Sequence, residues 1–333
     1  MTNQVEQLFE DEEEKKRTLE IIKAHKLKYP KKDLDELLDN LEEHGVSFNI
    51  KNRDEAKTLL EELNYFYKIT VYKRNFKKDS QGKYINLDFA YLSDLASVDM
   101  QLRYILTSFT LDIEHSLKTF LMKKATENVE TDGYDIIESF MQSTEDNDYS
   151  YTLTKEDIFK KASNSKSYQY NLYQTHKDCP PIWAAIEVMS FGDLIELFIY
   201  YFTRFPEDDI NISSIRGLLT GVKKIRNSSV HNNPFLFDLS SGNLDTINSY
   251  LRKYVQEGRI GEMYYKIPKV HDVLCVIYAH DRFVKGSGSR YYRMESLNSL
   301  VTKSIERFSY LESDNDIVHF FKVLKLMVDK YGH

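Results

Sequence analysis

The sequence predicts an all-α protein, and three observations support that prediction. Apolar residues recur at helical spacing through most of the chain. Glycine and proline are scarce, with 12 and 6 among 333 residues, whereas a β-barrel or β-sandwich needs more tight turns. Hydrophobic residues make up 41% of the chain and charged residues 29%, which is the composition of a folded globular protein. The length suits one large domain or two smaller ones.

The N-terminal part of the chain is expected to contain a series of helices. Residues 1–30 form a charged helix that is an appendage to the rest. A second helix, at 30–48, begins after a proline and ends at a glycine, and a third, at 52–76, begins at a capping asparagine or aspartate. After a turn at 79–84, an apolar stripe predicts a long amphipathic helix at 86–124.

The middle of the chain alternates between polar and apolar stretches. Residues 126–150 and 161–180 are polar and are predicted to be irregular, with a short segment at 151–160 between them. The most apolar segment is 180–202, in which Gly192 is expected to divide two helices. The C-terminal part is expected to hold helices at 243–257, 269–283, 294–312 and 315–331, and a flexible loop, KGSGSRYY, at 285–292.

A helix predicted at 215–234 ends in the stretch KKIRNSSVHNNP, which contains Arg226, Asn227 and His231. At about 100° per residue, Asn227 and His231 lie within about 40° of each other, whereas Arg226 and His231 lie about 140° apart. The spacing alone is common by chance. Two interpretations stay open. In the first, the three residues are the working end of an enzyme, and the reach of the arginine, a distorted last turn or a second helix packed alongside brings Arg226 and His231 to one phosphate. In the second, His231 bonds its own helix end while Arg226 forms a surface ion pair.

The charge distribution points to one class of partner. A net charge of −7 argues against a general coat for nucleic acid, and we expect no DNA partner. Residues 65–83 nevertheless carry six basic residues against Asp79 alone, with tyrosines between them. This segment is either an RNA contact or a solvated loop beside a tyrosine-rich core. The candidate phosphate contacts are Lys68, Lys73, Arg74, Lys77 and Lys78 there, and Lys118, Lys123, Lys124, Lys223 and Lys224 elsewhere.

Several classes of protein have no support in the sequence. Cys179 and Cys275 lie far apart, so neither a zinc cluster nor a disulfide framework is implied, and a reducing cytoplasm is expected. The acidic N-terminus is not a signal peptide, and no long apolar window predicts a transmembrane helix or a membrane partner. Nucleotide-binding and zinc-protease motifs do not occur, and the acidic clusters lack histidines at ligand spacing. We expect no metal and no cofactor.

Three stretches together resemble the Abi-like family of bacterial abortive-infection proteins, of the AbiD/AbiF type. In PPIWAAIEVMSFGDLIELF the matching residues are Pro181, Trp183, Glu187, Ser190, Phe191, Gly192 and Leu194. In the long helix they are Asp99, Leu102, Arg103 and Glu114, and in the third stretch they are Arg226, Asn227 and His231. Their order and spacing agree over about residues 33–240. One departure lies upstream, where Lys68 stands in place of the family's usual arginine.

The resemblance implies a HEPN-like helical bundle with additional N- and C-terminal helices. The expected organisation is an acidic helical extension at 1–30, an Abi-like HEPN domain at 31–240 and a C-terminal helical region at 241–333. In HEPN domains an Arg-x4–6-His motif marks a metal-independent endoribonuclease, so the residues of the third stretch are the expected catalytic residues. The resemblance further implies a phage-defence toxin that acts on RNA as a homodimer and is neutralised by a small structured non-coding RNA.

Other residues of these stretches have more than one interpretation. Arg103 and Glu114 either pair with each other to support the site, contact RNA, or are structural or solvated charges. Glu187 lies on an apolar helix, so it either anchors Arg226 or Arg103 or makes an unrelated structural bond. Trp183 is expected in the core rather than against a base. The alternative to a ribonuclease is a catalytically inactive helical RNA-binding or scaffold protein that senses phage.

Overall fold

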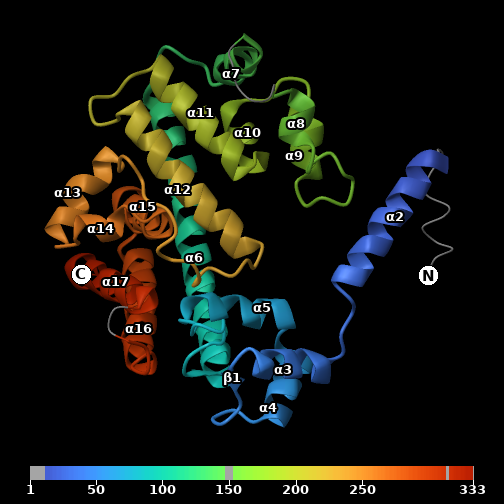
Figure 1. Ribbon diagram of the computed structural model, residues 1–333. Helices are drawn as coiled ribbons and strands as arrows, with labels where there is room; N and C mark the ends of the chain where they lie inside the picture. Colours follow the sequence, from blue (N-terminus) through green and yellow to red (C-terminus); the bar gives the residue numbers. More distant parts are fainter. Residues whose placement is uncertain (1–11, 147–152, 313–314, 333) are drawn as a thin grey trace. The chain divides into compact units, whose positions relative to one another are not determined.

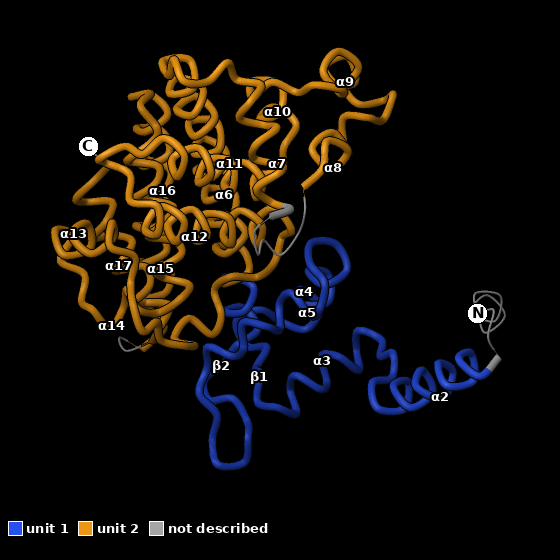
Figure 2. The backbone as a smooth tube through the Cα atoms, turned by 90° about the horizontal axis from the view of Figure 1, so that it is seen from above, with its two compact units in different colours: residues 1–94 blue, residues 95–333 orange. Residues whose placement is uncertain are grey.

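A computed structural model describes residues 12–146, 153–312 and 315–332 (Figure 1). Within these ranges the secondary structure is helical apart from one pair of two-residue strands and an isolated bridge, so the all-α prediction is confirmed. The chain divides into two compact units, residues 1–94 (unit 1) and 95–333 (unit 2), which Figure 2 colours separately. The domain boundaries expected near residues 30 and 240 stay predictions.

Unit 1 combines short helices with a two-stranded parallel ribbon. Its elements are α2 (Glu12–Lys28), α3 (Leu34–Glu43), β1 (Val46–Ser47), α4 (Arg53–Thr58), η1 (Leu59–Leu63), α5 (Phe66–Thr70), η2 (Val71–Asn75) and β2 (Leu87–Asp88). Asp33 and Glu36 form a capping box at the start of α3. Gly45 ends that helix with a φ of +88°, as expected. A Cβ there would lie 2.7 Å from the carbonyl oxygen of Tyr84, so the position requires glycine.

The segment predicted as one helix at 52–76 is divided in the structure. Asn52 caps α4 as expected, and its Oδ1 accepts from the N–H of Glu55 at 2.9 Å. After the π-helical turn η1 the backbone is extended at Asn64 and Tyr65, with ψ of 155° and 153°. Both residue types are weak helix formers, and asparagine competes with the helix for backbone hydrogen bonds. The apolar periodicity is therefore shared between short helices.

Helix α6 (Phe89–Glu127) is 39 residues long and confirms the predicted long helix. The apolar stripe recognised in the sequence is buried along it, from Leu95 through Leu102 and Phe109 to Leu121. The division between the two compact units falls inside this helix, after Asp94. From that point on, α6 carries the side chains that meet the candidate site of unit 2.

The stretch at 126–150, predicted to be irregular, contains a helix in its described part. Helix α7 (Asp135–Asp146) buries Ile136, Ile137 and Phe140 against the rest of unit 2. The short helices α8 (Lys155–Phe159) and α9 (Tyr170–His176) follow. The prediction was wrong here because these helices are short and rich in polar residues, so their periodicity spans too few turns to stand out.

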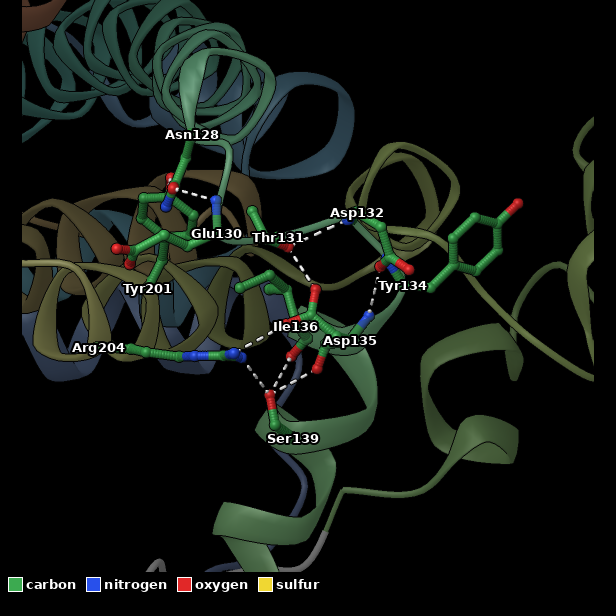
Figure 3. Close-up of polar contacts among 11 residues, drawn as sticks. Asn128, Glu130, Thr131, Asp132, Tyr134, Asp135, Ile136, Ser139, Tyr201 and Arg204 are labelled. Carbon is green, nitrogen blue, oxygen red and sulfur yellow. Dashed lines mark hydrogen bonds and ion pairs between the residues drawn. The ribbon is translucent and has the colours of Figure 1, made fainter.

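A polar network fixes the start of α7 (Figure 3). Arg204 donates to Ser139 Oγ at 3.0 Å and pairs with the carboxylate of Asp135 at 2.8 Å, and Thr131 also donates to Asp135. Burial alone would raise the pKa of Asp135, but the hydrogen bonds from Thr131 and Arg204 outweigh it, so the pKa lies below its usual value. Asp132 also caps this helix end locally, since its Oδ1 accepts from the N–H groups of Tyr134 at 2.9 Å and Asp135 at 3.1 Å. The long-range contacts of Arg204 add to that local cap.

The apolar segment at 180–202 forms two helices, as predicted. They are α10 (Ile182–Val188) and α11 (Phe191–Arg204), and α12 (Ile212–Val230) follows. The break lies at Met189 and Ser190 rather than at Gly192, because Ser190 caps α11 and its Oγ accepts from the N–H of Asp193 at 3.2 Å. Gly192 therefore lies in the first turn of α11.

Part of the C-terminal region packs against α12. Its helices are α13 (Ser249–Glu257), α14 (Glu262–Tyr265), α15 (Pro268–Phe283), α16 (Ser287–Arg307) and α17 (Asp316–Tyr331). Helix α15 packs along α12, where a Cβ on Gly221 would lie 2.9 Å from Sγ of Cys275. The prediction of a flexible loop at 285–292 is wrong, since α16 begins at Ser287. Glycine and serine occur at helix starts as well as in loops, so the sequence KGSGS suits both.

Candidate functional site

Helix α12 ends in a Schellman turn directly after the predicted catalytic residues. His231 is the C-cap residue, and Asn232 after it is left-handed with a φ of +57°. The backbone N–H groups of Asn232 and Asn233 donate to the carbonyl oxygens of Ser229 and Ser228, each at 3.0 Å. Asparagine tolerates the left-handed conformation better than most residues. The chain therefore reverses immediately after His231.

Arg226 is held between two other helices of unit 2. Its Nε lies 3.3 Å from Oε2 of Glu114 on α6, and its guanidinium carbon lies 5.5 Å from the ring centroid of Phe191 on α11. The side chain of Arg226 is 27% exposed. The ion pair is thus partly buried rather than a surface pair, and the guanidinium remains accessible to an anion.

The three stretches that carry the family resemblance meet around Arg226. The long helix contributes Glu114, and the apolar segment contributes Phe191 and Gly192. A Cβ on Gly192 would lie 2.9 Å from Nζ of Lys223, so the missing side chain leaves room for that ammonium group at the first turn of α11. Lys223 and Arg226 are three residues apart and lie on one face of α12. Together they present two cations.

Asn227 and His231 are exposed on α12. Within the residues that the structure describes, no hydrogen bond or ion pair joins Arg226 to His231. Within the same residues the His231 imidazole makes no hydrogen bond to its own helix end. The backbone N–H of His231 does donate to the carbonyl oxygen of Asn227, at 3.1 Å. The imidazole is therefore open to solvent, and the arginine and histidine remain apart, as their helical spacing predicts.

A buried pair on α6 reaches the turn after His231. Asp99 and Arg103 are 0% and 1% exposed, with 3.3 Å between Oδ2 and Nε. The Asp99 carboxylate accepts from the backbone N–H groups of Phe235 and Leu236 at 3.0 to 3.1 Å. Nη1 of Arg103 donates to Oδ1 of Asn232. The segment after α12 is therefore tied to α6.

Three supporting residues lie differently from expectation. Arg103 does not pair with Glu114, because eleven residues of helix separate them by about 16 Å and each has another partner. Glu187 is exposed rather than buried, and within the described ranges it forms no ion pair with either arginine of the site. Trp183 is 43% exposed rather than in the core, and it makes an edge contact with Tyr134 at 5.4 Å between ring centroids.

The candidate phosphate-contacting lysines of unit 2 differ in availability. Ion pairs join Lys118 to Glu114 at 4.0 Å, Lys123 to Glu127 at 3.7 Å and Lys224 to Asp272 at 3.5 Å. Lys124 is held most closely, by both carboxylate oxygens of Glu207 at 2.6 and 2.7 Å, and this hydrogen bonding raises the pKa of Lys124. A phosphate would have to displace that carboxylate. Lys223 has no acidic partner among the described residues.

In unit 1 the basic segment at 65–83 is only partly exposed. Lys68 is 6% exposed and its Nζ lies 5.7 Å from the ring centroid of Tyr65, so this residue offers a phosphate little accessible surface. Burial, and then the positive charge of Lys78, lowers the pKa of Lys73. The exposed basic and aromatic side chains are Arg74, Lys77, Lys78, Lys83, Tyr65 and Tyr67. The segment thus presents both cations and aromatic rings.

Within the described ranges, no group of three or more His, Cys, Asp or Glu side chains is arranged to hold a metal ion. None of the helices in the same ranges is both long and apolar enough to cross a membrane. Cys179 is exposed, Cys275 is buried, and both thiols are free.

Fold and site together define a helical protein that presents an arginine and a histidine at the end of one helix. The family model for Abi-like proteins matches residues 58–236, which is 179 of the 333 residues, and the chain belongs to that family. The match contains Glu114, Phe191, Arg226 and His231. Membership of this family points to abortive-infection defence. No curated protein and no solved structure gave a match.

Sequence reasoning missed one residue of this site and gave no role to two others. Asn232 was missed, although an asparagine between a helix and Pro234 is typical of the left-handed position after a C-cap. Asp99 and Phe191 were recognised only as matching residues of the resemblance. Their contacts are tertiary: Asp99 binds residues 136 and 137 positions away in the sequence, and spacing does not encode that.

Proposed function

We propose that this protein is a HEPN-type endoribonuclease toxin of anti-phage defence, which cleaves RNA through the 2′-OH of its substrate. The observation that supports this most is the end of α12, where a partly exposed Arg226 is fixed by Glu114 and Phe191 and an exposed His231 closes the same helix. A guanidinium and an imidazole supply the charge stabilisation and proton transfer that this reaction needs without a metal. The family match supports the role in defence.

In the proposed reaction the 2′-oxygen attacks the adjacent phosphorus while the bond from phosphorus to the 5′-oxygen breaks. The 2′-OH gives its proton to a base, and the 5′-oxygen takes a proton from an acid. His231 carries out one of these transfers. Arg226 binds the non-bridging oxygens, where negative charge develops, and Asn227 orients His231 or the phosphate. Lys223 binds a phosphate of the same strand. The products are a 2′,3′-cyclic phosphate and a 5′-OH.

The separation of Arg226 from His231 makes a second copy of the chain part of this proposal. In a homodimer, the arginine of one copy and the histidine of the other would act on one phosphate. The test mixes Arg226→Ala with His231→Ala after each has been shown to be inactive. Shared sites predict that a mixed dimer recovers cleavage at one intact site, whereas a site within one chain predicts no recovery. A chain that remains monomeric in light scattering contradicts this part.

The proposal also includes a small structured non-coding RNA that inhibits the toxin. The exposed cations and tyrosines of residues 65–83 offer phosphate binding and base stacking, as single-stranded RNA requires. Sequencing of RNA that co-purifies with His231→Ala tests this. One abundant structured species that stops cleavage by wild-type protein supports an RNA inhibitor. A random mixture of cellular fragments contradicts it.

The central test compares cleavage by wild-type protein and His231→Ala with chelator present throughout. We expect the variant to cleave at least about 100-fold more slowly, because general acid–base catalysis contributes that much. RNA affinity should change less than about threefold, since phosphate contacts dominate it. The matched control is His176→Ala, which alters a histidine at the end of α9. The RNA ends are mapped by ligation chemistry specific for cyclic phosphate and 5′-OH.

Two results would contradict the proposed function. One is complete loss of wild-type cleavage on adding chelator, and the other is full toxicity and cleavage by His231→Ala. A wild-type protein that binds RNA and arrests growth with no cleavage would instead support the catalytically inactive RNA-binding protein.

A further inference from the structure

His231 is exposed and owes its position to the backbone around it. Within the described chain its imidazole has no hydrogen-bond partner. What fixes the residue is therefore α12 before it and the Schellman turn after it, in which Asn232 is left-handed. The final turn of a helix frays readily unless other contacts hold it. A proton-transfer group at such a place needs an anchor.

The anchor is the buried pair on α6. Asp99 accepts from the backbone N–H groups of Phe235 and Leu236 at 3.0 to 3.1 Å, and it also pairs with Arg103. Arg103 donates to the side-chain oxygen of Asn232, so the pair holds the turn through a side chain and, three residues later, through the backbone. The first of these two attachments is on the residue adjacent to His231.

Burying this ion pair is poorly explained by stability alone. Charges at 0% and 1% exposure lose their hydration, and apolar residues of similar size commonly stabilise a fold as well or better. A planar guanidinium that pairs with a carboxylate and donates to an amide oxygen does, however, fix the direction of that amide. The geometry of Arg103 is therefore better explained by the position that it imposes on Asn232.

The choice of asparagine at position 232 supports the same conclusion. Glycine would adopt a φ of +57° with less strain. Asparagine tolerates that conformation and adds the oxygen that Arg103 binds. We infer that Asn232 is a positioning residue for His231 and acts through the buried Asp99–Arg103 pair. This inference rests on the proposed function, because it concerns how that site is held.

The test compares two variants that differ in one feature. Asn232→Gly keeps the left-handed turn and removes the acceptor, whereas Asn232→Asp keeps an acceptor oxygen for Arg103. At saturating RNA we expect Asn232→Gly to cleave about 10- to 100-fold more slowly, because small misplacements of a catalytic group have effects of that size. Its RNA affinity should stay within about twofold. Asn232→Asp should cleave within about threefold of wild type.

Two further measurements separate positioning from general damage. The pH profile of Asn232→Gly should keep the shape of the wild-type profile at a lower plateau, because His231 is still present. Hydrogen exchange of the amides of Asn232 and Asn233 should be about tenfold faster in Asn232→Gly than in Asn232→Asp. Wild-type cleavage by Asn232→Gly, or equal losses in both variants, would overturn the inference. If wild-type protein cleaves no RNA, the proposed function fails, and the exchange rates alone decide whether Arg103 holds the turn.

Discussion

Asp88 in unit 1 and Asp99 in unit 2 are both buried carboxylates, at 3% and 0% exposure, and both bind backbone from elsewhere in their unit. Asp88 accepts only from neutral donors. They are Ser47 Oγ at 2.8 Å and the N–H groups of Asn49 at 2.8 Å, Ile50 at 3.2 Å, Lys51 at 3.5 Å and Ala90 at 2.9 Å. Within the described residues no cation pairs with it. Asp99 accepts from two N–H groups and pairs with Arg103 as well.

The difference shows two ways to stabilise a buried negative charge. Backbone N–H groups and the Ser47 hydroxyl stabilise Asp88, and the result is a closed loop between β1 and the start of α6. Asp99 has a counter-ion, and that counter-ion also binds Asn232 beside the candidate site. The loop of unit 1 thus needs only a local acceptor, whereas the turn of unit 2 is fixed by a charged side chain from another helix.

The largest effect is expected from removing the charge of Asp99. Asp99→Asn should lower the free energy of unfolding by about 3–5 kcal/mol, because it leaves the buried Arg103 without its counter-ion. Urea unfolding at neutral pH measures the change. The control is the double variant Asp99→Asn with Arg103→Met, which removes both charges and should be more stable than the single variant. A loss below about 1 kcal/mol would show that the pair is not buried in solution.

A smaller effect is expected at Asp88. Asp88→Asn should lower the free energy of unfolding by about 2 kcal/mol, since it exchanges an acceptor for a donor but leaves no unpaired charge. Burial raises the pKa of Asp88, but the hydrogen bonds from Ala90, Ser47 and Ile50 outweigh it, so the pKa lies below its usual value.

That pKa gives the prediction a pH dependence. Because the folded-state pKa of Asp88 is below the unfolded value of about 3.9, its stabilisation is fully present above that value and is lost as pH falls through the folded-state pKa. Urea unfolding from neutral pH down to about pH 3 should therefore show the two proteins converging in acid. A difference between wild type and Asp88→Asn that stays constant with pH contradicts the role of the carboxylate charge.

The parts of the fold that the sequence predicted are those with long periodic patterns. Helix α6 and the pair α10 and α11 followed from apolar stripes that extend over several turns. Helix α7 was missed because it is short and rich in polar residues, although Asp132 just before it is a local capping signal. The start of α16 was missed because glycine and serine suit a helix end as well as a loop.

The candidate site was predictable only where residues are close in the chain. The spacing of Arg226 and His231 predicted that they point apart, and within the described residues no hydrogen bond or ion pair joins them. Their partners could not be deduced in the same way, because Glu114 and Asp99 come from a helix more than 100 residues earlier. Asn232 could have been predicted, because an asparagine shortly before Pro234 is a local signal of a helix end, but it was missed.

The smallest effect is expected at a third carboxylate, that of Asp135. It tests whether burial makes the Asp99–Arg103 ion pair stronger than an exposed one. Asp135 pairs with Arg204 at 2.8 Å, closer than Asp99 lies to Arg103, but the two side chains are 37% and 35% exposed. Water screens such a pair, so a double-mutant cycle of Arg204→Ala and Asp135→Asn should give a coupling of only about 0.5 kcal/mol. Urea unfolding of the four proteins measures it. A coupling above about 2 kcal/mol would mean that distance, rather than burial, sets the strength of these pairs, and the large effect expected at Asp99 would then need another cause.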